Sequence, residues 1–114
     1  GGFVQGAGWL TIEEVNWKSN GELTTHSPST YKIPAVNDMP EKFNVEIYKN
    51  LNKENVVNKS KTTGEPPLML AMSVFFAIKD AIASVRNYTK IPKLNSPATP
   101  EAILLSIKDL KNKL

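Results

Sequence analysis

The chain has 114 residues, of which 40% are hydrophobic and 22% are charged, a composition typical of a globular domain with a modest core. Its net charge is only +3, and its lysines are scattered except for Lys108, Lys111 and Lys113 near the C-terminus. Because nucleic-acid binders gather basic side chains on one face, we expect no nucleic-acid partner. The absence of cysteine excludes disulfide, zinc–thiolate and iron–sulfur sites built from this chain alone, and is compatible with the cytoplasm, where we expect it.

The chain shows no secretory signal and no obvious membrane segment. Its longest apolar run, residues 68–78, is interrupted by Ser73 and falls short of the ~20 residues that cross a bilayer, so we expect no membrane partner. The first residues, Gly1-Gly2-Phe3, already lie within an apolar pattern. We therefore interpret the chain as the interior of a longer polypeptide.

Residues 1–10 contain four of the six glycines among apolar residues. Glycines at positions 2, 6 and 8 would allow a helix or turn to approach another backbone closely, although each weakens an isolated helix. A glycine-rich phosphate loop is the functional alternative, but neither GxGxxG nor the P-loop lysine is present. The pattern favours close packing.

A β-hairpin and a third strand are predicted next. Residues 10–17 are rich in β-forming residues, Asn20-Gly21 is a strong hairpin-turn signal, and residues 23–26 would form the return strand. Residues 43–48 alternate apolar and polar, as in a half-buried strand. The only histidine, His26, has no second histidine or cysteine to share a metal, so we expect it to be solvated or packed.

Residues 60–68 place Glu65 between Gly64 and two prolines, directly before the most apolar part of the chain. Proline fixes its own φ and restricts the residue before it, so the Glu65 carboxylate should project from a stiff junction between loop and helix. Such a junction could aim a general base. It is also an ordinary helix start, where an acidic side chain is favourable.

Two helices complete the expected fold. Residues 67–88 are apolar on every side in their first turns, which indicates a helix that is buried all round. Thr99 and Pro100 form a capped helix start, and a single apolar stripe follows at Ile103, Ile107, Leu110 and Leu114. We expect an α+β fold in which the hairpin and third strand pack with the long helix, while the shorter C-terminal helix closes the end.

The residues by themselves do not select one chemistry. No nucleophile–base–orienter set surrounds the single histidine. A carboxylate pair could be drawn from Glu13, Glu14 or Glu65, but nothing in the spacing favours one combination. Glu65 is therefore a candidate base beside its structural interpretation as a helix-start carboxylate.

Four motifs in register carry a resemblance to one family. They are GGFVQGAGWLTIEE at residues 1–14, THSPSTYKIPA at 25–35, SKTTGEPPLMLAMSVFFAIKDA at 60–81 and NSPATPEAI at 95–103. In order and spacing the chain resembles the C-terminal end of the molybdopterin-binding subunit of the xanthine dehydrogenase and aldehyde oxidase family, closest to the bacterial xanthine dehydrogenase form. The resemblance covers nearly the whole chain and is weakest over residues 50–58 and the final helix.

The resemblance implies that Glu65, in GEPPL, is the catalytic base of hypoxanthine and xanthine oxidation. The family's carboxylate takes a proton from a molybdenum-bound hydroxyl, which attacks the purine. Electrons then leave through [2Fe-2S] clusters and FAD towards NAD. The cofactor would lie against the backbone at Thr63 and Gly64, although Thr62-Thr63 replaces the more frequent Ala-Val. No side chain would ligate the metal.

The resemblance also implies partners. These are the remainder of the molybdopterin-binding subunit, an iron–sulfur and FAD subunit or domain, a purine substrate and further copies in a homo-oligomer. Residues 1–114 would be one piece of the molybdopterin-binding domain, neither autonomous nor active alone. The alternatives are a segment of an aldehyde-oxidising relative and a non-catalytic structural or assembly module.

Overall fold

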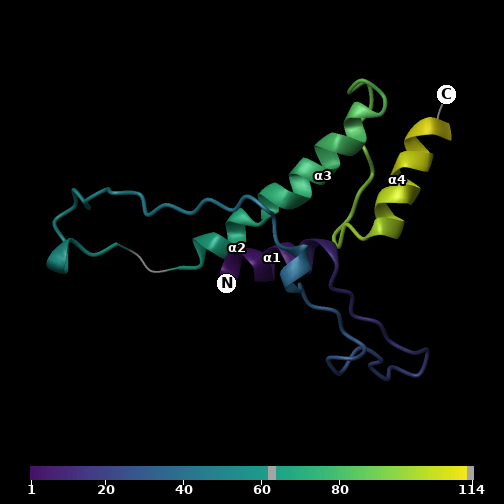
Figure 1. The fold of residues 1–114 in the computed structure, drawn as a ribbon, viewed down its shortest axis with the longest axis horizontal. Helices are drawn as coiled ribbons and strands as arrows, with labels where there is room; N and C mark the ends of the chain where they lie inside the picture. Colours follow the sequence, from purple (N-terminus) through teal and green to yellow (C-terminus); the bar gives the residue numbers. More distant parts are fainter. Residues whose placement is uncertain (62–63, 113–114) are drawn as a thin grey trace.

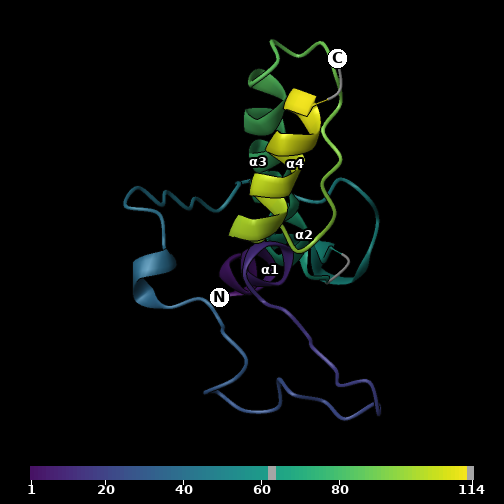
Figure 2. The same ribbon diagram turned by 90° about the vertical axis from the view of Figure 1, so that its right-hand side faces the viewer.

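The computed structural model describes residues 1–61 and 64–112, and these residues form helices joined by long extended segments (Figure 1). The elements follow in the order α1 (Gly2–Thr11), the short 3-10 helices η1 (Val36–Asp38) and η2 (Val57–Lys59), α2 (Pro66–Leu70), α3 (Met72–Ser84) and α4 (Pro100–Asn112). Helix α1 packs against α2 and the beginning of α3, and α4 lies beside α3 in both views (Figures 1 and 2).

The glycines of α1 allow it to approach α2 closely, as the sequence predicts. A Cβ atom added at Gly6 would lie 2.6 Å from the Leu68 carbonyl oxygen and 2.7 Å from the Ala71 Cβ. A Cβ at Gly2 would make only an ordinary contact, 3.5 Å from the Pro67 Cβ. Gly6 is therefore the position at which contact between the two helices requires glycine.

The long apolar helix is present but is divided in two. Helix α2 begins with two prolines in its first turn, and Ala71 separates it from α3. Helix α3 ends at Ser84 and not at residue 88, because Asn87 and Tyr88 adopt φ angles of 50° and 59°. Left-handed residues of this kind end a helix, and here the Tyr88 amide donates to the Ala83 carbonyl at 3.1 Å.

In the chain by itself this apolar helix is partly exposed, as expected of a piece that is separated from the rest of its domain. Among the described residues only Ala71 and Ile82 are buried within the segment, while four large apolar side chains are 41–62% exposed. These four are Met69, Leu70, Met72 and Phe76. The helix has an apolar surface for which this chain supplies too few neighbours.

The stretch Pro66–Ser84 meets the length and hydropathy expected of a membrane-spanning helix, whereas the apolar run at residues 68–78 is too short. Its 19 residues are long and apolar enough to cross a bilayer by length and composition, although only 17% of the relevant window is buried. The core helix of a water-soluble protein passes the same test, so this single candidate is weak support for a membrane span.

Helix α4 begins as the sequence predicts. The amide of Ala102 donates to the Thr99 hydroxyl at 3.2 Å, which is the hydrogen bond of an N-cap. The apolar stripe of α4 meets α3 and the preceding loop in a small core. Its buried members are Ile82, Leu94, Ala98 and Leu110. Leu114, the last predicted member of the stripe, lies outside the described residues.

The predicted α+β fold is wrong, because the described residues contain no β-strand. The hairpin turn does form: Gly21 adopts a φ of 85°, and the Lys18 amide donates to the Glu22 carbonyl at 2.9 Å. Pairing then stops at one isolated bridge between Trp17 and Leu23. A two-stranded ribbon is marginal in water unless one face is covered, and Trp17 is 63% exposed.

The predicted third strand lies in an extended arm that makes no ladder within the described part of the chain. Val45 and Ile47, which were expected to face the core, are 73% and 92% exposed. The arm extends far from the helices (Figure 1). As a result the radius of gyration is 18.7 Å, compared with about 13 Å for a compact domain of this length.

Candidate functional site

The candidate catalytic residue, Glu65, lies at the junction where the extended arm enters α2. Glu65 is the N-cap residue, and Pro66 and Pro67 form the first two helical positions. Its carbonyl oxygen accepts hydrogen bonds from the amides of Leu68 at 3.1 Å and Met69 at 3.3 Å. The prolines and these two bonds fix the backbone from which the carboxylate projects.

The Glu65 side chain is exposed, and it makes no capping hydrogen bond to α2. It also has no ion pair with any residue that the structure describes. The carboxylate therefore makes no capping bond, although its place at the start of α2 agrees with the interpretation of a helix-start carboxylate that the helix dipole favours. Within the described part of the chain it is free to act on a group supplied from elsewhere.

The backbone beside Glu65 is open. A Cβ atom added at Gly64 would meet nothing within 4 Å apart from its own chain neighbours. The space next to this glycine could therefore admit a cofactor. Thr63, the other predicted cofactor-binding residue, lies outside the described residues.

The position of α2, and with it that of Glu65, is set by α1. Gly6 and Ala71 are both buried where the two helices meet. Leu68, three residues after Glu65, supplies the atom closest to a Cβ added at Gly6, its carbonyl oxygen, and the Ala71 Cβ is the next closest. The glycine-rich helix α1 thus packs against α2 and holds in place the helix that begins at Glu65.

The three glutamates considered as a carboxylate pair do not come together. Glu13 is buried, and its carboxylate accepts a short hydrogen bond from the Tyr31 hydroxyl. Glu14 is exposed beside the start of α4. Glu65 alone lies at the proline junction, so a two-carboxylate mechanism has no basis in this structure.

The Glu13–Tyr31 hydrogen bond is an interaction that sequence reasoning missed. It ties the loop at residues 25–35 to the C-terminal end of α1, and the Glu13 carboxylate also lies against Gly8. The hydrogen bond to Glu13, desolvation and the negative charge of Glu13, in that order, raise the pKa of Tyr31. A buried acid eighteen positions from a tyrosine gives no local signal, because their contact depends on how the loop folds back.

The described residues offer no candidate site at which protein side chains could ligate a metal ion. They contain no group of three or more His, Cys, Asp or Glu side chains that could hold a metal ion. His26 is exposed in the loop that follows the hairpin turn.

Comparison with known proteins shows what this chain is similar to. A family model described as a molybdopterin cofactor-binding domain matches residues 1–40. Xanthine dehydrogenase/oxidase of Felis catus is 48% identical over 109 residues, which cover 90% of this chain and 8% of that protein. Xanthine dehydrogenases of Oryza sativa and Dictyostelium discoideum are 43% and 47% identical, each over 96% of this chain and 9% and 8% of their own lengths.

The chain is similar, over most of its length, to one segment of these xanthine dehydrogenases. It spans less than a tenth of the length of these curated relatives. The resemblance stated from the four motifs is confirmed at this level. The closer resemblance to the bacterial form of the enzyme stays a prediction, since the three named relatives come from an animal, a plant and Dictyostelium discoideum.

The match to relatives extends past the region that the family model covers. The model ends at residue 40, before the proline junction, whereas the relatives align over at least 90% of the chain. The similarity to these relatives does not by itself assign a role to Glu65. That role is argued from the junction.

Proposed function

We propose that this chain forms part of the molybdopterin-binding domain of a molybdenum hydroxylase that oxidises hypoxanthine and xanthine, with Glu65 as the general base. The observation that carries the proposal is the state of Glu65. Its carboxylate is exposed and uses none of its acceptor capacity on the described residues, while its backbone is fixed by two prolines and supported by α1.

The residues present fit the proposed cofactor. The open space at Gly64 would let the pterin and its metal approach the backbone. A contact with Thr63 is proposed from the resemblance alone. The molybdenum cofactor, when bound, would supply the two-electron oxidation of the purine carbon. Nothing in this chain needs to ligate the metal for that arrangement.

The task of Glu65 is to accept a proton on a carboxylate oxygen. A base of this kind contributes about 10²–10⁴-fold to a rate when it is held within hydrogen-bond reach of the proton. The prolines at the first two positions of α2 reduce the conformations that the Glu65 backbone can sample, which favours such positioning. Other parts of the domain would cover the exposed carboxylate and exclude water from it.

The remaining proposed partners would lie in the large part of the relatives that this chain does not match. The rest of the molybdopterin-binding subunit would cover the apolar side of α2 and α3, and an iron–sulfur and FAD part would remove electrons. We further propose a homo-oligomeric enzyme in the cytoplasm. Residues 1–114 would be a non-autonomous piece of one domain, without activity when separated.

Substitution of Glu65 tests the proposed function. In the full-length enzyme, Glu65→Gln should lower kcat for xanthine by at least about a hundredfold, because the amide cannot accept the proton. Protein yield and molybdenum content should not change. Glu46→Gln, in the exposed arm, is the matched control and should retain full activity.

Activity of Glu65→Gln within about tenfold of the unsubstituted enzyme would reject the general-base role. A loss of molybdenum in the same variant would instead indicate that Glu65 holds the cofactor. Equal turnover of xanthine and aldehydes would favour the aldehyde-oxidising alternative.

A further inference from the structure

Residues 91–96 form a strip between α3 and α4 in which residues 91–95 alternate in burial as in a β-strand, before the chain bends at Ser96. Pro92 and Leu94 are buried, whereas Ile91, Lys93 and Asn95 are exposed. Leu94 belongs to the core that α3 and α4 share. One face of the strip is therefore anchored, as in a strand that covers a core.

The backbone of this strip is not paired within the described part of the chain. Five amides are available at Ile91 and residues 93–96, and none donates to a described residue. Pairing resumes only where the Ala98 amide donates to the Leu10 carbonyl at 2.7 Å. Backbone donors of ordered segments are almost always paired, and an unpaired strand edge is a template for another strand.

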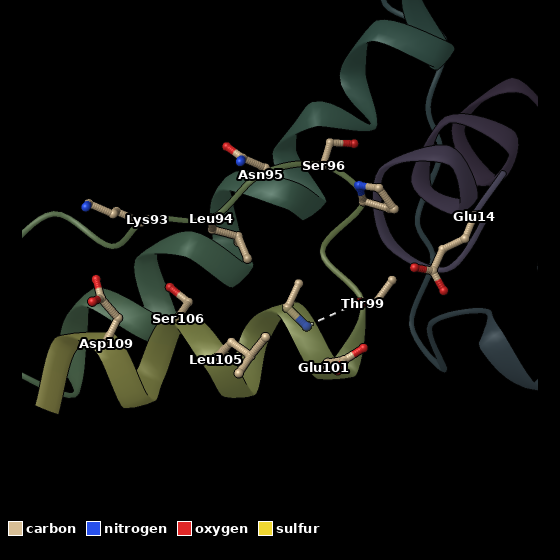
Figure 3. Close-up of a pocket in the computed structure, with 12 residues that line it drawn as sticks. Glu14, Lys93, Leu94, Asn95, Ser96, Thr99, Glu101, Leu105, Ser106 and Asp109 are labelled. Carbon is tan, nitrogen blue, oxygen red and sulfur yellow. Dashed lines mark hydrogen bonds between the residues drawn. The ribbon is translucent and has the colours of Figure 1, made fainter. Parts of the chain in front are cut away.

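A second, independent feature is a buried polar side chain on α4 that faces the strip. Ser106 on α4 is only 3% exposed, and its hydroxyl oxygen has no hydrogen-bond partner among the described residues. Its side chain points from α4 towards the strip at Lys93 and Leu94 (Figure 3). Buried hydroxyl groups are nearly always hydrogen-bonded, so this one marks a missing partner.

The strip and α4 enclose a groove of about 470 Å³ that Ser106 lines. It is lined by residues 93–97 and Thr99, and an extended peptide could lie along them because its backbone carries both donors and acceptors. No segment within the described residues occupies it. More than nine-tenths of the length of the curated relatives lies outside the region that this chain matches, so an occupant from the same polypeptide is available.

We propose that an extended segment from the rest of the same family polypeptide adds as a β-strand to residues 91–96 and hydrogen-bonds to Ser106. This inference rests on the proposed place of the chain within a larger domain and is independent of the chemistry of Glu65. The strip would then be the edge strand to which this piece attaches, with Pro92 and Leu94 on its buried face.

Hydrogen exchange of the full-length protein tests the added strand. In a paired edge, alternate amides point to the new strand, so either Lys93 and Asn95 or Leu94 and Ser96 should be protected at least about a hundredfold more than the alternate pair. The Glu65→Gln protein should show the same pattern. A failure of the catalytic proposal would therefore leave this result unchanged.

Ser106 is tested separately by thermal denaturation of the full-length protein. Ser106→Ala should lower the midpoint of unfolding, because it would leave the added strand without its partner. Ser19→Ala, in the exposed hairpin turn and without a side-chain hydrogen bond to a described residue, is the control and should not change the midpoint.

Three results would overturn the proposal. The first is rapid exchange of all five amides, and the second is uniform protection without alternation, which indicates general burial and not strand pairing. The third is alternating protection that appears only at high protein concentration, which would assign the strip to a second copy. A Ser106→Ala midpoint equal to that of Ser19→Ala would remove Ser106 from the site.

Discussion

At the scale of single residues, the two carboxylates that matter serve different purposes because their surroundings differ. Glu13 is buried and bound by Tyr31, so it holds the loop at residues 25–35 on α1. Glu65 is exposed and unbound among the described residues, so it remains available for chemistry. In the sequence both are simply acidic residues beside apolar segments, and only burial and hydrogen bonding separate them.

The Glu13–Tyr31 hydrogen bond should make the stability of the fold decrease as the pH becomes alkaline. Because the pKa of Tyr31 is raised in the folded state, the hydrogen bond stabilises the fold below the usual tyrosine pKa of about 10 and is lost as pH rises through the raised value. Tyr31→Phe should lower the unfolding midpoint at pH 8 and flatten this alkaline decline. Urea denaturation from pH 8 to 11 measures both effects.

The control for Tyr31→Phe is Tyr48→Phe. Tyr48 is 84% exposed in the extended arm, and its substitution should leave the stability and its pH dependence unchanged. The same midpoint for both variants at pH 8 would show that the Tyr31 hydrogen bond contributes nothing to the fold.

Gly64 offers a further test at the residue scale. Because nothing lies within 4 Å of a Cβ added there, Gly64→Val should not disturb the packing of this chain. In the full-length enzyme it should reduce molybdenum content or raise KM, since the added methyl groups would occupy the proposed cofactor approach. Metal analysis and steady-state kinetics check this, and unchanged values for both would contradict the assignment of Gly64.

At the scale of elements, the contact between α1 and α2 depends on one glycine. Gly6→Ala should gain about 0.5–1 kcal/mol of helix propensity but lose about 1–3 kcal/mol to overpacking against Leu68 and Ala71, so packing decides the sign. The variant should be less stable and, in the enzyme, less active, because α2 carries Glu65. Denaturation and kcat measurements test the two effects together.

Gly2→Ala is the matched control for Gly6→Ala, because its Cβ would make an ordinary contact at 3.5 Å. It should be neutral or slightly stabilising. A Gly6→Ala protein as stable and active as Gly2→Ala would show that α2 can shift without cost and that α1 does not position Glu65.

At the scale of the whole molecule, the chain contains fewer packing partners than its apolar segments require. Among the described residues the core cluster has four buried side chains, and the arms extend well beyond a compact shape. Most of α2 and the beginning of α3 remain uncovered, with Met69 and Leu70 more than 60% exposed. This is the form expected of a piece that folds against the rest of a larger domain.

The uncovered helix predicts self-association of the separated 114-residue chain. Sedimentation at increasing concentration should show oligomers or aggregates, and Met69→Lys with Phe76→Lys should reduce them because charges would interrupt the apolar surface. Lys substitutions at the exposed Val45 and Ile47 give a control in the arm. A monodisperse chain at all concentrations would contradict the prediction.

Sequence alone determined the features whose causes are local. The start of α4 follows from Thr99 and Pro100, the hairpin turn from Asn20-Gly21, and the stiff junction at Glu65 from two adjacent prolines. Four short motifs were enough to indicate the family. These features need no distant partner, because capping, turn conformation and proline geometry act within a few residues.

Tertiary structure decided which apolar segments find a partner. The alternation at residues 43–48 predicts a strand, but pairing needs a neighbour that the described residues do not supply. Gly6 and Glu13 acquired their roles only through Leu68 and Tyr31, residues distant in the sequence. Periodicity shows that a face must be covered, whereas only the folded chain shows whether its cover lies within these residues.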